Sequence, residues 1–266
     1  MTRELELIDW IKTQAPDAGD DCAVLDCEPW GTLLVTTDSV IDGVHAHWAR
    51  HGGAAFGYKA VARGLSDIAA MAGEPLWALV AACLPEDVQS SDAQGVLEGA
   101  QETGCRIVGG DVSFGPTPYV VATVLGRAHG NGPVLRSTAR VSDWIVVSGK
   151  LGVNDQLRPQ PRVSEARALA EQCDIGAMID LSDGLSADMH NILEASNVGC
   201  RLEPDLIPCD DLDAALNRGE DYELLATVRP GELPDGFTRI GEITDAKDGA
   251  RIGNEPLRRG GYEHGA

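Results

Sequence analysis

Carboxylates recur along this chain at the ends of short apolar runs, and each stands beside small, turn-forming residues. The segments concerned are residues 19–25, 36–39, 65–68, 109–111, 179–184 and 219–223. Several carboxylates from distant segments cannot crowd together in ionised form unless cations neutralise them. Clusters of hard oxygen ligands suit Mg²⁺, which binds a few carboxylates together with waters and substrate phosphates. The first hypothesis is therefore a magnesium-dependent enzyme that acts on phosphates.

The common nucleotide-binding loops are missing from the sequence. It contains no Gly-x-x-x-x-Gly-Lys-Ser/Thr loop, no Gly-x-Gly-x-x-Gly after an expected strand and no protein-kinase signature set. A nucleotide would therefore be bound by another arrangement. Six scattered histidines argue against a transition-metal site, so His45 is better suited to hydrogen-bond a ligand phosphate than to bind a metal.

Length and composition limit the class of protein. The 266 residues suffice for two modest domains or one large one, and the apolar content of 43% supports a folded core. The net charge of −21 argues against a nucleic-acid partner, because contacts to a phosphate backbone need clustered Lys and Arg. Seven cysteines without a Cys-x-x-Cys pair favour reduced, mostly buried thiols.

Neither a membrane span nor a secretory leader is expected. No apolar run reaches the length of about 18 residues that a membrane-spanning helix needs. The N-terminus lacks the basic start and the long apolar stretch of a signal peptide. We therefore expect no membrane association and a cytoplasmic location.

The elements that must position the carboxylates are strands and helices in mixed order. Strands are expected over residues 33–37, 76–84, 105–108, 119–125, 145–147, 222–228 and 237–243, and into Asp180. Helices are expected over residues 5–13, 54–71, 88–103, 164–172 and 185–195. The first of these strands would deliver Asp38 at its end, and the strand over 105–108 would end at Asp111. The mixture favours an α+β fold with a boundary near residues 130–133, which gives domains 1–130 and 131–266.

Two features allow more than one interpretation. Lys59, Arg63 and Asp67 form an i, i+4, i+8 stripe, and spacing favours a solvated helix face with weak ion pairs over a position of Asp67 in a cleft. Asp183 precedes the helix expected over 185–195, so it could cap that helix, and the same geometry would also suit phosphate binding.

The acidic segments, taken together and in order, resemble thiamine-phosphate kinase, a family in the superfamily that includes aminoimidazole ribonucleotide synthetase. The matching stretches are residues 19–25, 36–48, 58–75, 107–113, 135–149, 158–162, 178–192 and 219–225. They cover nearly the whole chain. The resemblance implies a two-domain architecture, with an N-terminal α+β domain that pairs with a second subunit, a C-terminal α/β-layered domain and an active site in the cleft between them.

The resemblance also implies the reaction and its residues. Thiamine phosphate and ATP would give thiamine diphosphate and ADP, with several Mg²⁺ ions as cofactors. The ions would be bound by Asp21, Thr36, Thr37, Asp38, Asp67, Asp111, Asp180 and Asp183. ATP would contact Gly110, Asp111, Arg136 and Ser182. Thiamine phosphate would contact His45 and Glu220, with Tyr262 as the nearest candidate for the aromatic residue that stacks on the substrate.

The chain departs from the family pattern at a few places, and these leave rivals open. Gly64 stands where members commonly have Asn, Arg218 replaces the first glycine of a Gly-Gly-Glu-Asp motif, and the stretch between Gly152 and Arg158 is short. The rivals are a selenophosphate synthetase-like enzyme, a hydrogenase-maturation-like ATPase and a degenerate nucleotide-binding subunit without activity. The first would need a reactive Cys near a Gly-rich N-terminus and the second a C-terminal Cys, and neither is found in the sequence.

Overall fold

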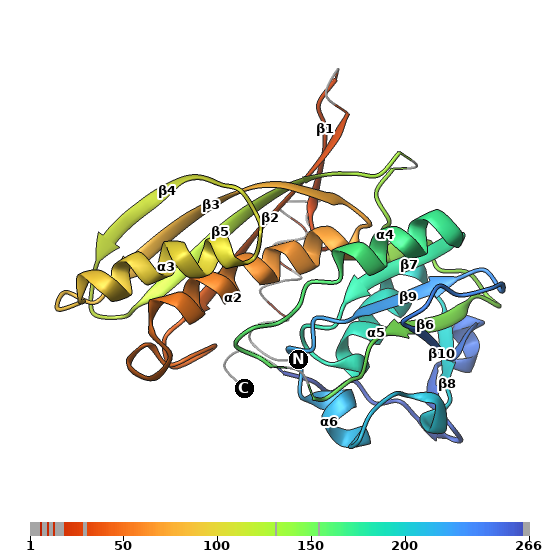
Figure 1. Ribbon diagram of the computed structural model, residues 1–266. Coiled ribbons are helices and arrows are strands. Elements are labelled where there is room, and N and C mark those ends of the chain that lie inside the picture. The colour runs from red at the N-terminus through yellow and green to blue at the C-terminus, as the bar shows by residue number, and fades with distance from the viewer. Residues whose placement is uncertain are drawn as a thin grey trace.

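The computed structural model describes residues 6, 10, 13, 19–28, 31–130, 132–153 and 155–262. Most of the helix expected over residues 5–13 lies outside this range. The described chain forms two lobes, each built on its own β-sheet, and a long helix runs from one lobe to the other (Figure 1).

The first lobe is a five-stranded sheet with two helices on one face (Figure 1). Its strands, in the spatial order β1-β2-β5-β3-β4, are β1 (Ala23–Asp26), β2 (Thr32–Ile41), β5 (Tyr119–Arg127), β3 (Glu74–Leu84) and β4 (Ile107–Phe114). The helices are α2 (Trp48–Ala70) and α3 (Ser90–Glu102). Alternate residues of the strands, such as Leu34, Val120 and Val124, are fully buried against α2. Among the described residues, no helix covers the opposite face of the sheet.

Helix α2 approaches the sheet closely because of a glycine. A Cβ atom at Gly64 would lie 2.5 Å from Cγ2 of Val124 on β5, which is too close for any side chain unless Val124 or the helix shifts. The Gly64 departure therefore has a packing reason in this chain. The helix also begins earlier than expected, with a break at Gly52, whose φ is 69°.

The second lobe is a seven-stranded sheet. Its spatial order is β12 (Glu255–Pro256), β11 (Ala250–Ile252), β8 (Gly199–Leu202), β10 (Phe237–Thr244), β6 (Trp144–Ser148), β9 (Leu224–Val228) and β7 (Ile175–Asp180). The helices of this lobe are α4 (Val163–Gln172), α5 (Leu185–Ser196) and α6 (Leu212–Asn217), with short 3-10 turns η1 (Arg136–Thr138), η2 (Pro204–Leu206) and η3 (Ala246–Asp248).

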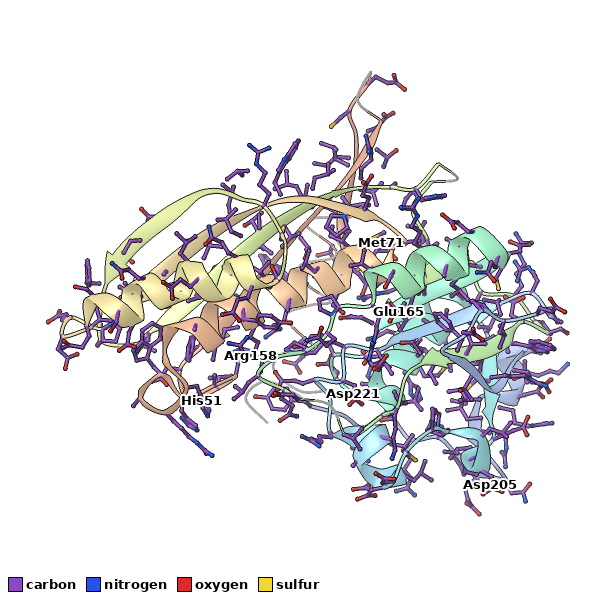
Figure 2. The ribbon with its side chains drawn as sticks, in the orientation of Figure 1. His51, Met71, Arg158, Glu165, Asp205 and Asp221 are labelled. Atoms are coloured by element: carbon purple, nitrogen blue, oxygen red, sulfur yellow. The ribbon has the colours of Figure 1, made fainter. Side chains whose placement is uncertain are left out.

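The central strands of the second sheet are buried on both faces, which explains their uninterrupted apolar sequences. On β6, Ile145 and Val147 pack in a cluster with α5 and α6, whereas Val146 packs in a second cluster with α4. That second cluster also contains Ala69 and Ala70 from the C-terminal end of α2. Figure 2 labels Met71 at this end of the helix, beside α4. Helix α2 therefore belongs to the cores of both lobes.

The expected α+β, two-domain fold is confirmed, with two corrections to strand ends. Asp38 and Asp111 were expected where strands stop, but β2 continues to Ile41 and β4 to Phe114. Asp38 pairs with Ala122, and Asp111 pairs with Ala81, because the neighbouring strands extend past both positions. The strand expected from residue 222 starts at Leu224, since Tyr222 has a φ of 52°.

Two smaller expectations concern membrane-spanning helices and cysteines. Among the described residues, no helix has the length and apolar character needed to cross a membrane. The seven cysteines are free thiols, but only Cys22, Cys83 and Cys200 are buried and the other four are half-buried, so the expectation of mostly buried thiols is wrong.

Candidate active site

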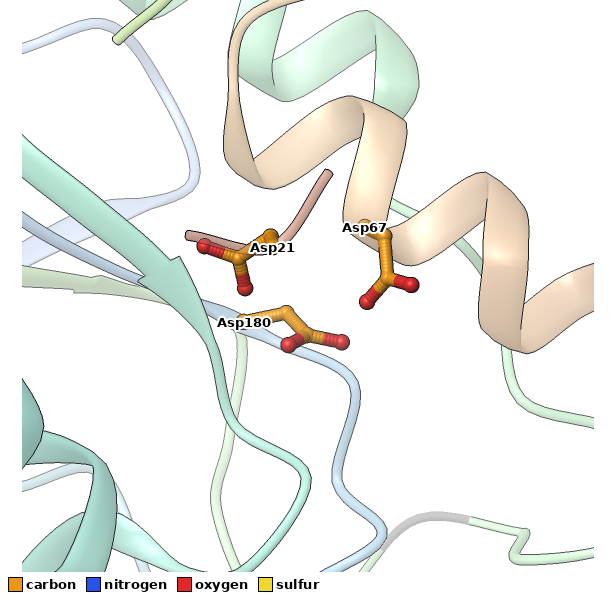
Figure 3. Close-up of side chains that lie close together, drawn as sticks. All are labelled: Asp21, Asp67 and Asp180. Carbon is orange, nitrogen blue, oxygen red and sulfur yellow. The ribbon is translucent and has the colours of Figure 1, made fainter. Parts of the chain in front are cut away.

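Three aspartates from distant segments meet where the lobes join. Asp21 precedes β1, Asp67 lies on α2 and Asp180 ends β7, and oxygen atoms of all three lie within 4.8 Å of one another (Figure 3). The convergence depends on α2, whose C-terminal part is packed against the second sheet. The part of the chain that the structure describes contains no other group of three or more such residues at this spacing.

Hydroxyl groups and one guanidinium orient the three carboxylates. Ser66 donates to Asp180 at 2.6 Å, and Thr36 donates to Asp67 at 2.5 Å. Arg136 donates to both oxygens of Asp21, at 2.9 and 3.0 Å. Each carboxylate is therefore held by a partner that comes from a different segment of the chain.

The electrostatics of the cluster favour a bound cation. Burial, followed by repulsion from Asp38, Asp180 and Asp21, raises the pKa of Asp67 well above its usual range. Burial and then Asp21 raise the pKa of Asp180 from 3.8 to about 7. The guanidinium of Arg136 cannot neutralise three converging carboxylates, and the ligand atoms that they offer are all hard carboxylate oxygens, which fits Mg²⁺.

The charged stripe on α2 lies in the cleft and not on a solvated face, which corrects the expectation from spacing. Arg63 pairs with Asp38 at 3.0 Å, and Lys59, which is fully buried, pairs with Glu220 of the second lobe at 2.7 Å. The stripe therefore runs from the carboxylate cluster at Asp67 to the opposite end of the cleft. Spacing alone predicted a solvated face because it cannot show that the second lobe covers the side of α2 that faces away from the sheet.

A cavity of about 240 Å³ opens near the cluster, because its walls include Arg63, one helical turn before Asp67, and Ser182, which closely follows Asp180 in the chain. Its walls come from both lobes and are formed by Val44, His45, Arg63, Gln156, Ser182, Asp183, Arg218, Glu220, Tyr222 and Tyr262. The three residues expected to contact the acceptor, namely His45, Glu220 and Tyr262, are thus brought to one cavity. Ser182 and Asp183 lie on its side toward the aspartates.

Backbone groups hold two of these residues at the cavity. The Nδ1 atom of His45 accepts a hydrogen bond from the backbone N–H of Ile41 at 3.1 Å. This leaves the proton of a neutral ring on Nε2, where it can be donated to an anion. The backbone N–H of Tyr262 donates to the carbonyl of Asp183 at 3.0 Å, which ties this residue to the turn after β7, and its exposed side chain lines the cavity.

The loop that carries Glu220 has an unusual backbone. Gly219, Glu220 and Tyr222 have φ values of 69°, 57° and 52°, and the left-handed region costs a non-glycine residue roughly 1–2 kcal/mol. The loop is held by hydrogen bonds from the N–H of Glu220 to Ser182 and from the N–H of Tyr222 to Leu181. Its conformation is therefore coupled to the turn that follows β7. Figure 2 labels Asp221 between the two lobes.

The turn after β7 is organised by Asp188, a residue that the sequence analysis did not single out. Its buried carboxylate accepts hydrogen bonds from the N–H groups of Asp183 and Gly184, both at 3.1 Å. Gly184, with a φ of 113°, is the N-cap of α5, so Asp183 does not serve that purpose. The sequence offered one sign of this contact: Asp188 lies four residues after Gly184, in the first turn of the expected helix, where its carboxylate can reach back to the N–H groups before the helix.

Three residues expected at the site are not brought to the cluster within one chain. The hydroxyl of Thr37 lies on the uncovered face of the first sheet, 3.2 Å from that of Thr123. Asp111 lies on the edge strand β4. Asp38 pairs with Ala122, Ala122 with Val80 and Val80 with Gly110, so Asp38 and Gly110 lie in the same row across the sheet and face the same side. Strand alternation therefore places Asp111 on the same uncovered face as Thr37. Gly110, the third of these residues, lies within β4. Arg136, by contrast, reaches the cluster through its hydrogen bonds to Asp21.

Family comparisons cover both lobes. The family described as AIR synthase related protein, N-terminal domain, matches residues 19–128, and its C-terminal domain counterpart matches residues 120–254. The boundary near residues 130–133 stays a prediction.

Curated relatives extend over most of the chain. A thiamine-monophosphate kinase from Rhodopirellula baltica is 36% identical over 242 residues, which is 80% of this chain and 76% of that protein. The thiamine-monophosphate kinase of Escherichia coli K12 is 32% identical over 302 aligned positions, which cover 92% of this chain and 90% of the relative.

Solved structures agree with these matches. A structure described as AaThiL complexed with AMPPCP and TMP has a TM-score of 0.88 and 28% identity, covering 98% of this chain and 96% of that one. Thiamine monophosphate kinase from Aquifex aeolicus has a TM-score of 0.84 and 27% identity, over 97% and 99%. The hydrogenase maturation protein HypE of E. coli, with a TM-score of 0.70, 19% identity and 97% coverage of both chains, shares the fold alone.

Proposed function

The chain belongs to the thiamine-monophosphate kinase family of AIR synthase related proteins, and we propose that it transfers the terminal phosphoryl group of ATP to thiamine monophosphate, giving thiamine diphosphate and ADP. The observation that carries this proposal is the adjacency of two features. The converging carboxylates of Asp21, Asp67 and Asp180 stand beside a cavity lined by His45, Glu220 and Tyr262.

The carboxylate cluster would hold Mg²⁺. Asp21, Asp67 and Asp180 supply the oxygens, and Asp38 lies close enough to raise the pKa of Asp67. When bound, magnesium ions neutralise phosphate charge and align the two phosphates for in-line transfer. Arg136 adds a fixed positive charge at Asp21, on the side proposed for ATP.

The cavity suits an acceptor that has an anionic end and a cationic ring. The Nε2–H of His45 can donate to the acceptor phosphate, and the Glu220 carboxylate suits the positive charge of the thiamine ring. The nucleophile is a phosphate oxygen that is already ionised near neutral pH, so the reaction needs no strong general base. Binding and orientation by the chain's residues are then the main requirements.

A second copy of the chain would cover the open face of the first sheet. Trp77, Leu79 and Tyr119 are 38–41% exposed there, which is unusual for large apolar side chains on one sheet face. We propose a homodimer through this face, which would also bring Thr37 and Asp111 into the interface. Light scattering at tens of micromolar should give twice the mass of the chain, and a monomer would contradict the proposal. A cytoplasmic location stays a prediction.

A coupled assay of ADP release tests the proposed activity. Release should depend on both Mg²⁺ and thiamine monophosphate, and thiamine without its phosphate should not replace the acceptor. ADP release that ignores the acceptor would favour a hydrogenase-maturation-like ATPase. A folded protein that binds ATP without releasing ADP would favour a degenerate nucleotide-binding subunit.

A further inference from the structure

Lys59 has a buried position that the proposed reaction does not yet explain. It is one of the largest fully buried side chains among the described residues, although a lysine is rarely buried without a specific partner. It lies on α2 of the first lobe and faces the second lobe across the cleft. Burial lowers the pKa of its ammonium group, and the nearby Glu220 opposes that effect.

The ammonium group of Lys59 contacts both walls of the acceptor cavity. Its Nζ atom lies 2.7 Å from Oε1 of Glu220, and it donates to the backbone carbonyl of His45 at 2.8 Å. His45 and Glu220 come from different lobes, and both line the cavity. One buried cation therefore joins the two residues that are proposed to contact the acceptor.

The loop around Glu220 explains why such an anchor is useful. Its left-handed backbone is tied by main-chain hydrogen bonds to the turn at Ser182, but those bonds do not fix the carboxylate. The Glu220 side chain is 24% exposed, so without a partner it could turn toward water. A hydrogen-bonded ion pair holds it in one direction.

We propose that Lys59 is a positioning residue for the acceptor: its ammonium group holds the Glu220 carboxylate and the His45 backbone at a fixed separation on opposite walls of the cavity. The inference rests on the proposed function for the identity of the acceptor. The placement of the loop by Lys59 does not depend on that identity.

The kinetic test compares Lys59→Met, Glu220→Gln and the double variant with wild type. Methionine keeps the aliphatic bulk of the side chain and removes its charge. Lys59→Met should raise the KM for thiamine monophosphate about ten-fold, since it removes one partner of a desolvated charge pair, and should change the KM for ATP less than about two-fold. The double variant should lose no more than the worse of the two single variants, because both remove the same interaction. Lys247→Met, at an exposed lysine paired with Asp245 at 3.8 Å, is the matched control.

Three kinetic outcomes would overturn the proposal. A lower KM for thiamine monophosphate in Lys59→Met would mean that Lys59 competes with the cationic ring for Glu220. Equal effects on the KM values of acceptor and ATP would indicate a general structural role, as would losses in the double variant that multiply.

Hydrogen exchange gives a test that does not require activity. In Lys59→Met without ligands, amides of residues 218–223 should exchange faster than in wild type, whereas those of α4 should not change. Unchanged exchange in residues 218–223 would overturn the positioning role. If wild type shows no ADP release dependent on thiamine monophosphate, the proposed function fails, and the exchange result still decides the role of Lys59.

Discussion

Replacing Asp180 by asparagine should stabilise the metal-free protein while abolishing its activity. Asp180 is 3% exposed, and it shares its site with Asp21 and Asp67. Burial, the main cause, and repulsion raise its pKa from 3.8 to about 7, so the folded state resists its ionisation. Asparagine is nearly isosteric and can still accept the hydrogen bond that Ser66 donates.

The size and the pH dependence of the effect follow from that pKa. One pKa unit corresponds to about 1.36 kcal/mol, so a rise from 3.8 to about 7 destabilises the folded state by up to roughly 4 kcal/mol once Asp180 is ionised. Between about pH 4 and pH 7 the folded state binds more protons than the unfolded state, so stability falls as pH rises. We therefore expect Asp180→Asn to gain about 2–4 kcal/mol at pH 8.5, and little at pH 4.5.

Urea unfolding with a chelator, followed by circular dichroism at both pH values, measures this difference. Asp235→Asn, at an exposed aspartate, is the control and should match wild type. Added Mg²⁺ should stabilise wild type more than Asp180→Asn, because a ligand of the folded state stabilises it by mass action. The reasoning is refuted if, with chelator at pH 8.5, Asp180→Asn is no more stable than wild type.

Three further substitutions test the site and the packing around it. Asp38→Asn should lower turnover by about 100-fold or more, since it removes a charge from the metal cluster, and near-normal turnover of the folded variant at limiting Mg²⁺ would count against the site. His45→Ala should raise the KM for thiamine monophosphate and leave that for ATP nearly unchanged; a change in the KM for ATP alone would show that the acceptor side is misassigned. Gly64→Asn should lower the free energy of unfolding by about 1–3 kcal/mol through overpacking, and Val124→Ala should restore part of it, since the two side chains would share one space. No recovery in that double variant would exclude the clash as the cause.

The sequence predicted those features that depend on local pattern. The apolar runs into Asp180 and over 145–147 are β7 and β6, whose burial on both faces makes them easy to recognise. The local pattern wrongly placed Asp38 at the end of a strand. Aspartate is uncommon inside strands, but pairing with β5 extends β2 past this position.

The rest of the site depends on contacts between lobes. Spacing shows that Lys59, Arg63 and Asp67 share one side of a helix, but not that a second lobe covers that side. The contact of Ser66 with Asp180 joins residues 114 positions apart, and no local rule reports it. The left-handed backbone at Glu220 was also hidden, since nothing in a glutamate's identity requires it.

The C-terminal end of α2 is packed inside the second lobe, and this packing limits how the two lobes can move relative to each other. Ala69 and Ala70 are fully buried among residues of β6, β7, β9 and α4, so rotating one lobe away from the other would break an apolar core. We therefore expect α2 to act as a rigid spine and not as a hinge, so that the cleft keeps its width while ligands enter and leave. We then expect ligand access to depend on the loops that line the cavity, at Val44 and at Tyr262. The same spine should make the two lobes unfold in a single cooperative transition.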